Sequence, residues 1–96
     1  MATVLVDAEN VRRSVWPNIS RPELEQLARE WGGDHGHAVQ VVWEGVETAD
    51  DRIAYEVRQL PPPVWVVTSD RGLRERVSDV VERVIGGGTF ARELRR

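Results

Sequence analysis

Apolar and polar positions along the chain follow two alternating patterns. Short runs rich in β-branched residues at 3–6, 39–43, 64–68 and 84–85 predict four buried strands. Between these runs, apolar residues recur at helical spacing, and the helices are expected at 21–31, from 48 onward, at about 72–82 and after 89. Because strands alternate with helices, the pattern predicts one α/β domain over residues 1–96, in which a parallel sheet carries helices on both faces as a three-layer sandwich.

Polar and glycine residues mark the expected ends of these helices. Ser20 and Thr48 each precede a helical stripe and are placed to cap it. Asp51 holds the capping-box position relative to Thr48. The pair Gly32-Gly33 is expected to end the first helix, because glycine commonly follows the last helical residue.

The strands are expected in the order 2-1-3-4, which is a doubly wound sheet. Ligands bind such sheets beyond the carboxyl ends of the strands where the order reverses, here between the first and third strands. Asp7 directly follows the first strand, and Asp70 comes just after the third. Asp50 stands three residues before Ile53 and continues the buried stripe toward this edge, whereas Asp51 is rotated away by about 100°.

The three aspartates Asp7, Asp50 and Asp70 allow two interpretations. An Asp at the start of a helix is usually a cap or a partner of the helix dipole, which accounts for any one of them alone. Three carboxylates in one crevice, however, repel each other and raise each other's pKa unless a cation is present. Hard oxygen ligands with open positions suit Mg²⁺ or Mn²⁺, and such an ion can activate water and hold a phosphate oxygen.

Three short segments resemble the motifs of the NYN domain family, whose fold is similar to that of PIN domains. Residues 6–10 (VDAEN) resemble the D-x-x-N opening of NYN domains. Residues 47–51 (ETADD) and 67–71 (VTSDR) resemble the two later motifs of the YacP-like branch, in the same order. Proteins of that branch are longer and carry a further strand and loop before the second motif, where this chain runs almost directly into Glu47.

The resemblance implies a metal-dependent endoribonuclease that hydrolyses RNA. Carried over by position, it makes Asp7, Asp50 and Asp70 the catalytic metal ligands, with Mg²⁺ or Mn²⁺ as cofactor. It also implies that Asn10 and Ser69 support the site by positioning an Asp or a metal-bound water. The alternative is a catalytically silent module of the same fold that binds RNA or protein, because one segment of the family pattern is missing.

Arginines close to the motifs are candidates for phosphate binding. Arg71 and Arg74 begin the third helix and, with Arg12 and Arg13, are expected to form a substrate rim; exposed arginines without a role are the alternative. Arg71 and Asp51 are grouped with the supporting residues of the site.

Two further features involve aromatic side chains outside the acidic motifs. Trp16 follows the first motif and could stack a base, but packing in its own loop is favoured because Trp usually buries. His35 and His37 are spaced like a metal pair, yet they lie in a loop away from the expected site, and no metal is expected there.

Composition narrows the class of protein further. All 13 basic residues are Arg, so the Lys that a P-loop NTPase or a phosphoacceptor receiver domain needs is missing. There is no Cys, which removes disulfides and thiolate metal sites. The first residues lack the pattern of a signal peptide and no run is long enough to span a membrane, so a cytoplasmic protein is expected. A chain of 96 residues buries a modest core, and a homodimer is one way to add to it.

Overall fold

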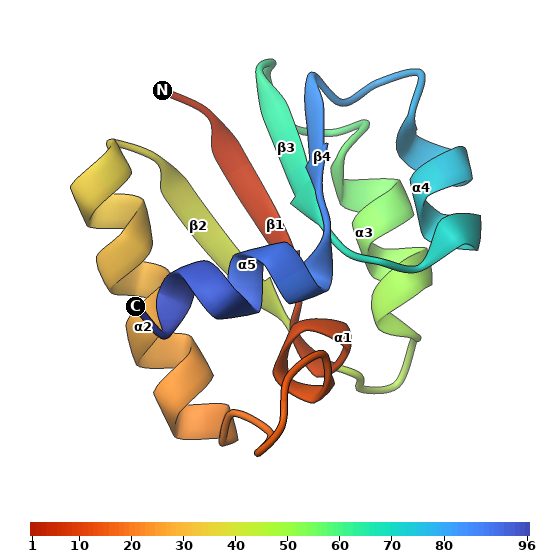
Figure 1. Cartoon of the computed structure of the whole chain (residues 1–96). Coiled ribbons are helices and arrows are strands. Elements are labelled where there is room, and N and C mark those ends of the chain that lie inside the picture. Colours follow the sequence, from red (N-terminus) through yellow and green to blue (C-terminus); the bar gives the residue numbers. More distant parts are fainter.

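A parallel sheet of four strands runs through the centre of the molecule, in the order β2-β1-β3-β4 (Figure 1). A computed structural model describes all 96 residues of the chain. The strands are β1 (Thr3–Asp7), β2 (Ala38–Val42), β3 (Val64–Val67) and β4 (Arg83–Ile85), and every neighbouring pair is parallel. The predicted strand order and the α/β class are therefore confirmed.

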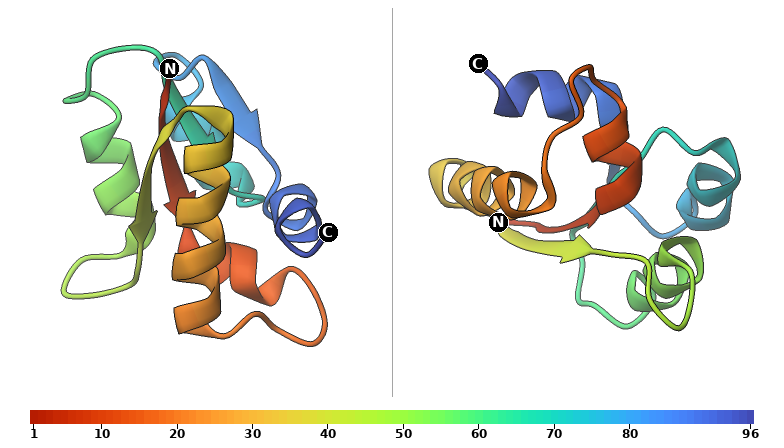
Figure 2. Two further views of the ribbon diagram at one scale, coloured as in Figure 1. Left: turned by 90° about the vertical axis from the view of Figure 1, so that its left-hand side faces the viewer. Right: turned by 90° about the horizontal axis from the view of Figure 1, so that it is seen from below.

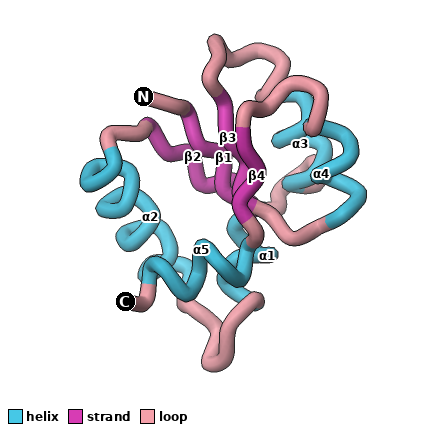
Figure 3. Tube along the Cα trace, turned by 45° about the horizontal axis from the view of Figure 1, so that its top comes forward, coloured by secondary structure: helices cyan, strands magenta, loops and turns pink.

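Five helices cover the two faces of the sheet (Figure 2). On one face lie α1 (Ala8–Arg13), α2 (Arg21–His35) and α5 (Gly87–Leu94). On the other face lie α3 (Ala49–Glu56) and α4 (Arg71–Val77). Figure 3 shows the strands side by side between α2 and the α3–α4 pair, as the predicted three-layer sandwich requires.

The central strand β1 is buried on both faces, which explains its unbroken apolar run. Val4 and Val6 pack into the core beneath α1, α2 and α5. Leu5 points to the opposite face, into the core beneath α3 and α4. All three side chains are completely buried, as expected for a parallel sheet whose faces both carry helices.

The first predicted helix boundary is wrong, because α2 continues through Gly32-Gly33 to His35. Gly32 is not a helix stop but a contact point: a Cβ there would lie 2.5 Å from Cγ2 of Val39 in β2. The helix ends instead at Gly36, whose φ of 72° is the left-handed conformation that glycine adopts most easily. Glycine thus serves close packing at one position and termination at another.

Other boundaries were confirmed or shifted. Ser20 accepts a hydrogen bond from the backbone N–H of Glu23, and Thr48 from that of Asp51, so both predicted caps are confirmed. The last helix begins at Gly87 rather than after Thr89. The predicted third helix was too long, because α4 ends at Val77 and the segment that follows packs against the core as turns.

Helix α1 was not predicted at all, because six residues that follow β1 directly show no clear helical period. No helix in the structure combines the length and the apolar character needed to cross a membrane.

Candidate active site

An open, acidic pocket lies at the carboxyl ends of β1 and β3. No hydrophobic side chain lines it, and its walls are Asp7, Glu9, Asn10, Arg13, Glu44, Asp50 and Asp70. The three aspartates predicted from the sequence are therefore brought together, with Asn10 and Arg13 beside them. Two carboxylates that were not predicted, Glu9 and Glu44, join them.

Asp7 is the most deeply placed carboxylate of the pocket. It is the last residue of β1 and is only 4% exposed. The hydroxyl of Thr68, one position beyond the end of β3, donates to its Oδ2 at 2.8 Å. Burial raises the pKa of Asp7 from its usual 3.8 to about 6; the Thr68 hydrogen bond opposes this rise, and the nearby charges of Asp50, Glu44 and Asp70 add to it.

Thr68 also contacts Asp70, so one hydroxyl binds the carboxylate of Asp7 and the backbone of Asp70. Its Oγ1 accepts a hydrogen bond from the backbone N–H of Asp70 at 3.1 Å while it donates to Asp7. Asp70 caps α4, because its Oδ1 accepts from the backbone N–H of Leu73 at 2.8 Å. The capping interpretation is therefore correct for Asp70, but it occupies only one carboxylate oxygen and leaves Oδ2 without a protein partner.

Asp50 and Asp51 point in different directions, as the helical stripe predicts. Asp50 is partly buried, lines the pocket and makes no hydrogen bond. Its pKa is raised, first by burial and then by the charges of Asp70 and Glu44. Asp51 is exposed and lies outside the pocket, where its Oδ1 accepts from Nη1 of Arg76 at 2.9 Å, and this contact lowers its pKa. Asp51, predicted as a supporting residue, does not touch the site.

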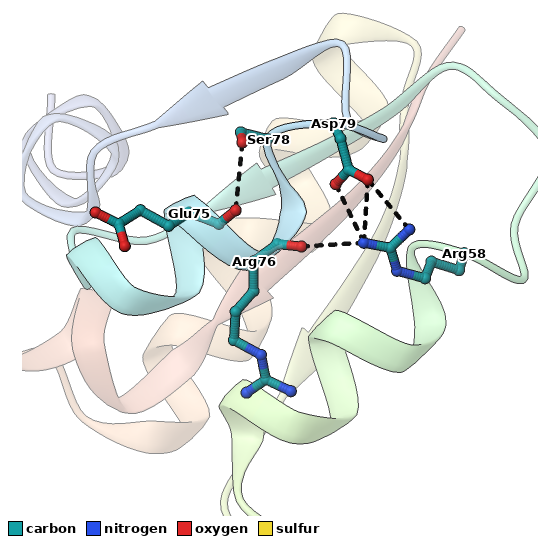
Figure 4. A network of polar contacts seen from close by, with 5 residues as sticks. All are labelled: Arg58, Glu75, Arg76, Ser78 and Asp79. Atoms are coloured by element: carbon teal, nitrogen blue, oxygen red, sulfur yellow. Dashed lines mark hydrogen bonds and ion pairs between the residues drawn. The ribbon is translucent and has the colours of Figure 1, made fainter.

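Polar contacts join α3 to the carboxyl-terminal end of α4 (Figure 4). Nη2 of Arg58, just after α3, donates to Oδ1 of Asp79 at 3.1 Å and to the carbonyl oxygen of Arg76 at 3.2 Å. The Arg76 side chain reaches back to Asp51. Exposed pairs of this kind add little stability, but they link α3, which carries Asp50, to α4, which Asp70 caps.

Asn10 and Ser69 act on the backbone around the site and not on a carboxylate. Asn10 Oδ1 accepts a hydrogen bond from the backbone N–H of Ser69 at 2.9 Å. Ser69 Oγ in turn accepts from the backbone N–H of Gly87 at 2.8 Å. These two bonds tie together α1, the loop before α4 and the start of α5. Both residues thereby support the loop that carries Asp70.

Replacing Gly87 with Ala is expected to lower stability by about 1–3 kcal/mol, the usual cost of overpacking. A Cβ at this position would overlap Oδ1 of Asn10 and lie 3.1 Å from Oγ of Ser14. The matched control is Gly88→Ala, whose Cβ meets only the flexible end of Arg92, at 3.2 Å. Because Ala is the better helix former, the control should be neutral or stabilising. Urea unfolding of both variants measures the difference, and equal stability would contradict the close approach at Gly87.

The predicted arginine rim is only partly present. Glu9 lies between three arginines, with Nε of Arg12 at 3.7 Å, Nε of Arg13 at 3.1 Å and Nη2 of Arg21 at 3.2 Å from its carboxylate oxygens. The Arg12 side chain is turned inward with 20% of its surface exposed, so Arg12 is not the free rim cation that was expected. Arg13 reaches the pocket, but as a partner of Glu9.

Arg71 and Arg74 fit the prediction better. They line a neighbouring hollow together with Ser69, which adjoins Asp70 in the chain. Both are exposed, and neither has a carboxylate within ion-pair distance. Their charges are therefore available to a phosphate beside the acidic pocket.

Trp16 does not pack in its loop as favoured from the sequence. Its side chain is 88% exposed, in the segment between α1 and α2. The loop is closed by its backbone, since the N–H of Ile19 donates to the carbonyl of Arg12 at 3.1 Å, and completely buried Ile19 takes the core position instead. The indole of Trp16 is consequently free to contact a ligand.

The donor set of the pocket fits a hard divalent cation by its chemistry. All the candidate ligands are carboxylate oxygens, and Asp7 is fixed by Thr68 with Oδ1 free. As the side chains are placed, no three of them enclose a single point that an ion could occupy. Asp50, which no hydrogen bond holds, is the carboxylate freest to turn toward the other two.

Comparisons with known proteins give no match to this chain. No protein-family model matches the chain, and neither curated proteins nor solved structures give a significant match.

Proposed function

We propose that this chain is a cytoplasmic, divalent-metal-dependent endoribonuclease of the NYN type. The observation that carries the proposal is Asp7, a carboxylate 4% exposed at the end of a central strand, with the charges of Asp50, Glu44 and Asp70 around it. Such crowding of charge costs stability and has no structural benefit that an uncharged residue could not supply. A bound cation would remove that cost. The resemblance of three ordered segments to NYN motifs supports the same conclusion.

In this proposal Asp7, Asp50 and Asp70 hold Mg²⁺ or Mn²⁺. The bound ion supplies Lewis-acid chemistry, lowering the pKa of a water and offsetting negative charge on a phosphate oxygen. Thr68 holds the carboxylate of Asp7 and the backbone of Asp70 through its two hydrogen bonds, and the backbone N–H of Leu73 holds Oδ1 of Asp70. No hydrogen bond restrains the Asp50 side chain, so a change of its rotamer could bring it to the ion.

Other side chains near the pocket suit a phosphodiester strand. The free guanidinium groups of Arg71 and Arg74 can bind phosphates on the α4 side of the site. On the α1 side, the exposed indole of Trp16 can stack on a base. The pocket itself is open and polar, which suits an extended RNA strand better than a small apolar ligand.

The second candidate function is an RNA-binding module without catalysis. The observation in its favour is that no three acidic side chains enclose one point in this structure. The short connection between β2 and α3, where the related pattern has a further strand, points the same way. In that case the arginines and Trp16 would still contact RNA.

An RNA cleavage assay separates the two candidates. End-labelled single-stranded and hairpin RNAs are incubated with the protein in millimolar Mn²⁺ or Mg²⁺, or in EDTA. Internal fragments that form only with the metal support the nuclease, and Asp34→Asn, an exposed carboxylate on α2 outside the pocket, should cleave like wild type. RNA binding without any metal-dependent fragment would favour the binding module.

A further inference from the structure

A second pocket lies on the α2–α5 side of the sheet and shares no residue with the acidic site. It has a volume of about 280 Å³ and lies over the amino-terminal halves of the strands, beside the carboxyl ends of α2 and α5. In Figure 1 this half of the sheet is seen above α5, with no helix in front of it. Its walls combine aromatic rings with arginines: Trp31, His37, Trp65, Arg83, Arg92 and Arg96.

The rings form a continuous row across the floor of this pocket. The ring centroids of Trp31 and His37 are 5.7 Å apart, and those of His37 and Trp65 are 4.5 Å apart. The guanidinium of Arg83 lies 4.9 Å from the Trp65 ring and continues the row at its edge. Trp31 is only 7% exposed, and His35 stacks on it with 4.6 Å between the ring centroids. The stacking surface of the row is therefore offered by the more exposed rings of His35, His37 and Trp65.

Each indole is fixed in orientation by a carboxylate outside the row. Nε1 of Trp31 donates to Oε2 of Glu93 at 3.0 Å, and Nε1 of Trp65 donates to Oε1 of Glu82 at 2.9 Å. The indole N–H groups of both rings are therefore satisfied, and the two rings are held in fixed orientations. A rigid surface of this kind loses little conformational entropy when a ligand binds.

The charge of the pocket is opposite to that of the whole chain. The protein has a formal net charge of −3, yet Arg83, Arg92 and Arg96 converge here without a carboxylate in ion-pair distance. Glu93 is the sole acidic residue of the lining, and it is engaged by Trp31. Three unpaired guanidinium groups around one hollow favour an anion, and phosphate is the one whose oxygens match their donor geometry.

We propose that this pocket binds a nucleotide, with the phosphate held by the arginines and the base stacked against the ring row. A metal is disfavoured by three neighbouring positive charges, and a bare phosphate would leave the aromatic floor unused. The volume is close to the lower end of ligand pockets in proteins, which suits one nucleotide unit and not a larger ligand. The unit is either a free nucleotide or one nucleotide of an RNA strand.

Titration followed by NMR tests this assignment with internal controls. The chain has four tryptophans, so its indole N–H signals report on the pocket (Trp31 and Trp65) and on two positions outside it (Trp16 and Trp43). Adenosine monophosphate should shift the first two signals and leave the others in place. Adenosine alone and inorganic phosphate alone should each bind at least about tenfold more weakly.

Variants and a short RNA complete the test. The double variant Arg83→Ala, Arg92→Ala should weaken binding at least about tenfold, whereas Arg52→Ala, an exposed and unpaired arginine of α3, should not. A single-stranded RNA octamer is then titrated and followed by the same two signals. Much tighter binding than that of the mononucleotide identifies an RNA strand as the ligand, and equal affinity identifies a free nucleotide. Phosphate binding as tightly as adenosine monophosphate, or binding unaffected by the double variant, overturns the proposal. This experiment measures nucleotide binding and not RNA cleavage. Its outcome is therefore independent of whether the nuclease proposal fails.

Discussion

Asp7→Asn is expected to abolish metal-dependent RNA cleavage and, without metal, to make the fold more stable at neutral pH. The side chain is almost the same in shape, and its amide oxygen can still accept the hydrogen bond of the Thr68 hydroxyl. What disappears is a buried charge that is costly without a cation. Loss of a residue that only hydrogen-bonds to a metal ligand typically costs roughly 10–100-fold in activity. Because Asp7 is proposed as a ligand itself, its loss should reduce cleavage by more than that.

The raised pKa of Asp7 makes the free energy of unfolding depend on pH. The pKa of Asp7 is raised from 3.8 to about 6, so between these values the folded state holds more protons than the unfolded state. Stability from this group is therefore fully present below about 3.8 and is lost as the pH rises through about 6. The shift corresponds to on the order of 3 kcal/mol. The difference in stability between Asp7→Asn and wild type should accordingly grow from pH 4 to pH 7.

Urea unfolding of both proteins across this pH range measures the difference, and Asp34→Asn again serves as the control. Millimolar Mn²⁺ should raise the Tm of wild type and leave that of Asp7→Asn nearly unchanged, because only the former binds the ion. A stability difference that stays constant with pH would show that Asp7 is not held at a raised pKa. Undiminished cleavage by Asp7→Asn would remove it from the site.

The positions of the strands and the meeting of the three aspartates could be predicted from periodicity, and the strand order from the usual topology of a doubly wound sheet. Asp7 comes at the end of a fully apolar run, and any residue there must lie at the carboxyl edge of a parallel sheet. Asp50 shares the stripe of Ile53, so its direction was set by helical geometry. These are local rules, and nothing in the tertiary structure opposed them.

The wrong expectations for the residues of the pocket have one origin, since short or irregular segments carry no period. Once 8–13 is a helix, Arg12 and Arg13 lie three and four residues after Glu9, on the same side, and the ion pairs follow. Missing that helix led directly to the wrong expectation for Arg12. Glu44 lies in an irregular loop, where the sequence does not determine the direction of a side chain. Thr68, by contrast, could have been found, because it stands two residues before Asp70 in a segment already singled out.

Asp50→Asn and Asp51→Asn are expected to change different properties, the first cleavage and the second thermal stability, although the two residues are adjacent. Asp50→Asn should lose metal-dependent cleavage and keep or slightly raise the Tm, because it removes a charge crowded by Asp70 and Glu44. Asp51→Asn should keep cleavage, because its side chain is exposed and turned to Arg76. It should lower the Tm slightly through loss of that ion pair, while its backbone N–H still donates to Thr48.

A cleavage assay and a melting curve on both variants, with Mn²⁺ and a structured RNA, make this comparison. The pair is its own control, since the two substitutions are chemically identical and occupy neighbouring positions in the first turn of α3. The Mn²⁺-dependent rise in Tm should persist in Asp51→Asn and vanish in Asp50→Asn, which separates metal binding from catalysis. If Asp51→Asn loses cleavage while Asp50→Asn keeps it, the carboxylate assigned to the metal is the wrong one, and α3 must rotate when the ion binds. If both variants keep the Tm rise and the activity, α3 contributes no ligand and the site reduces to Asp7 and Asp70.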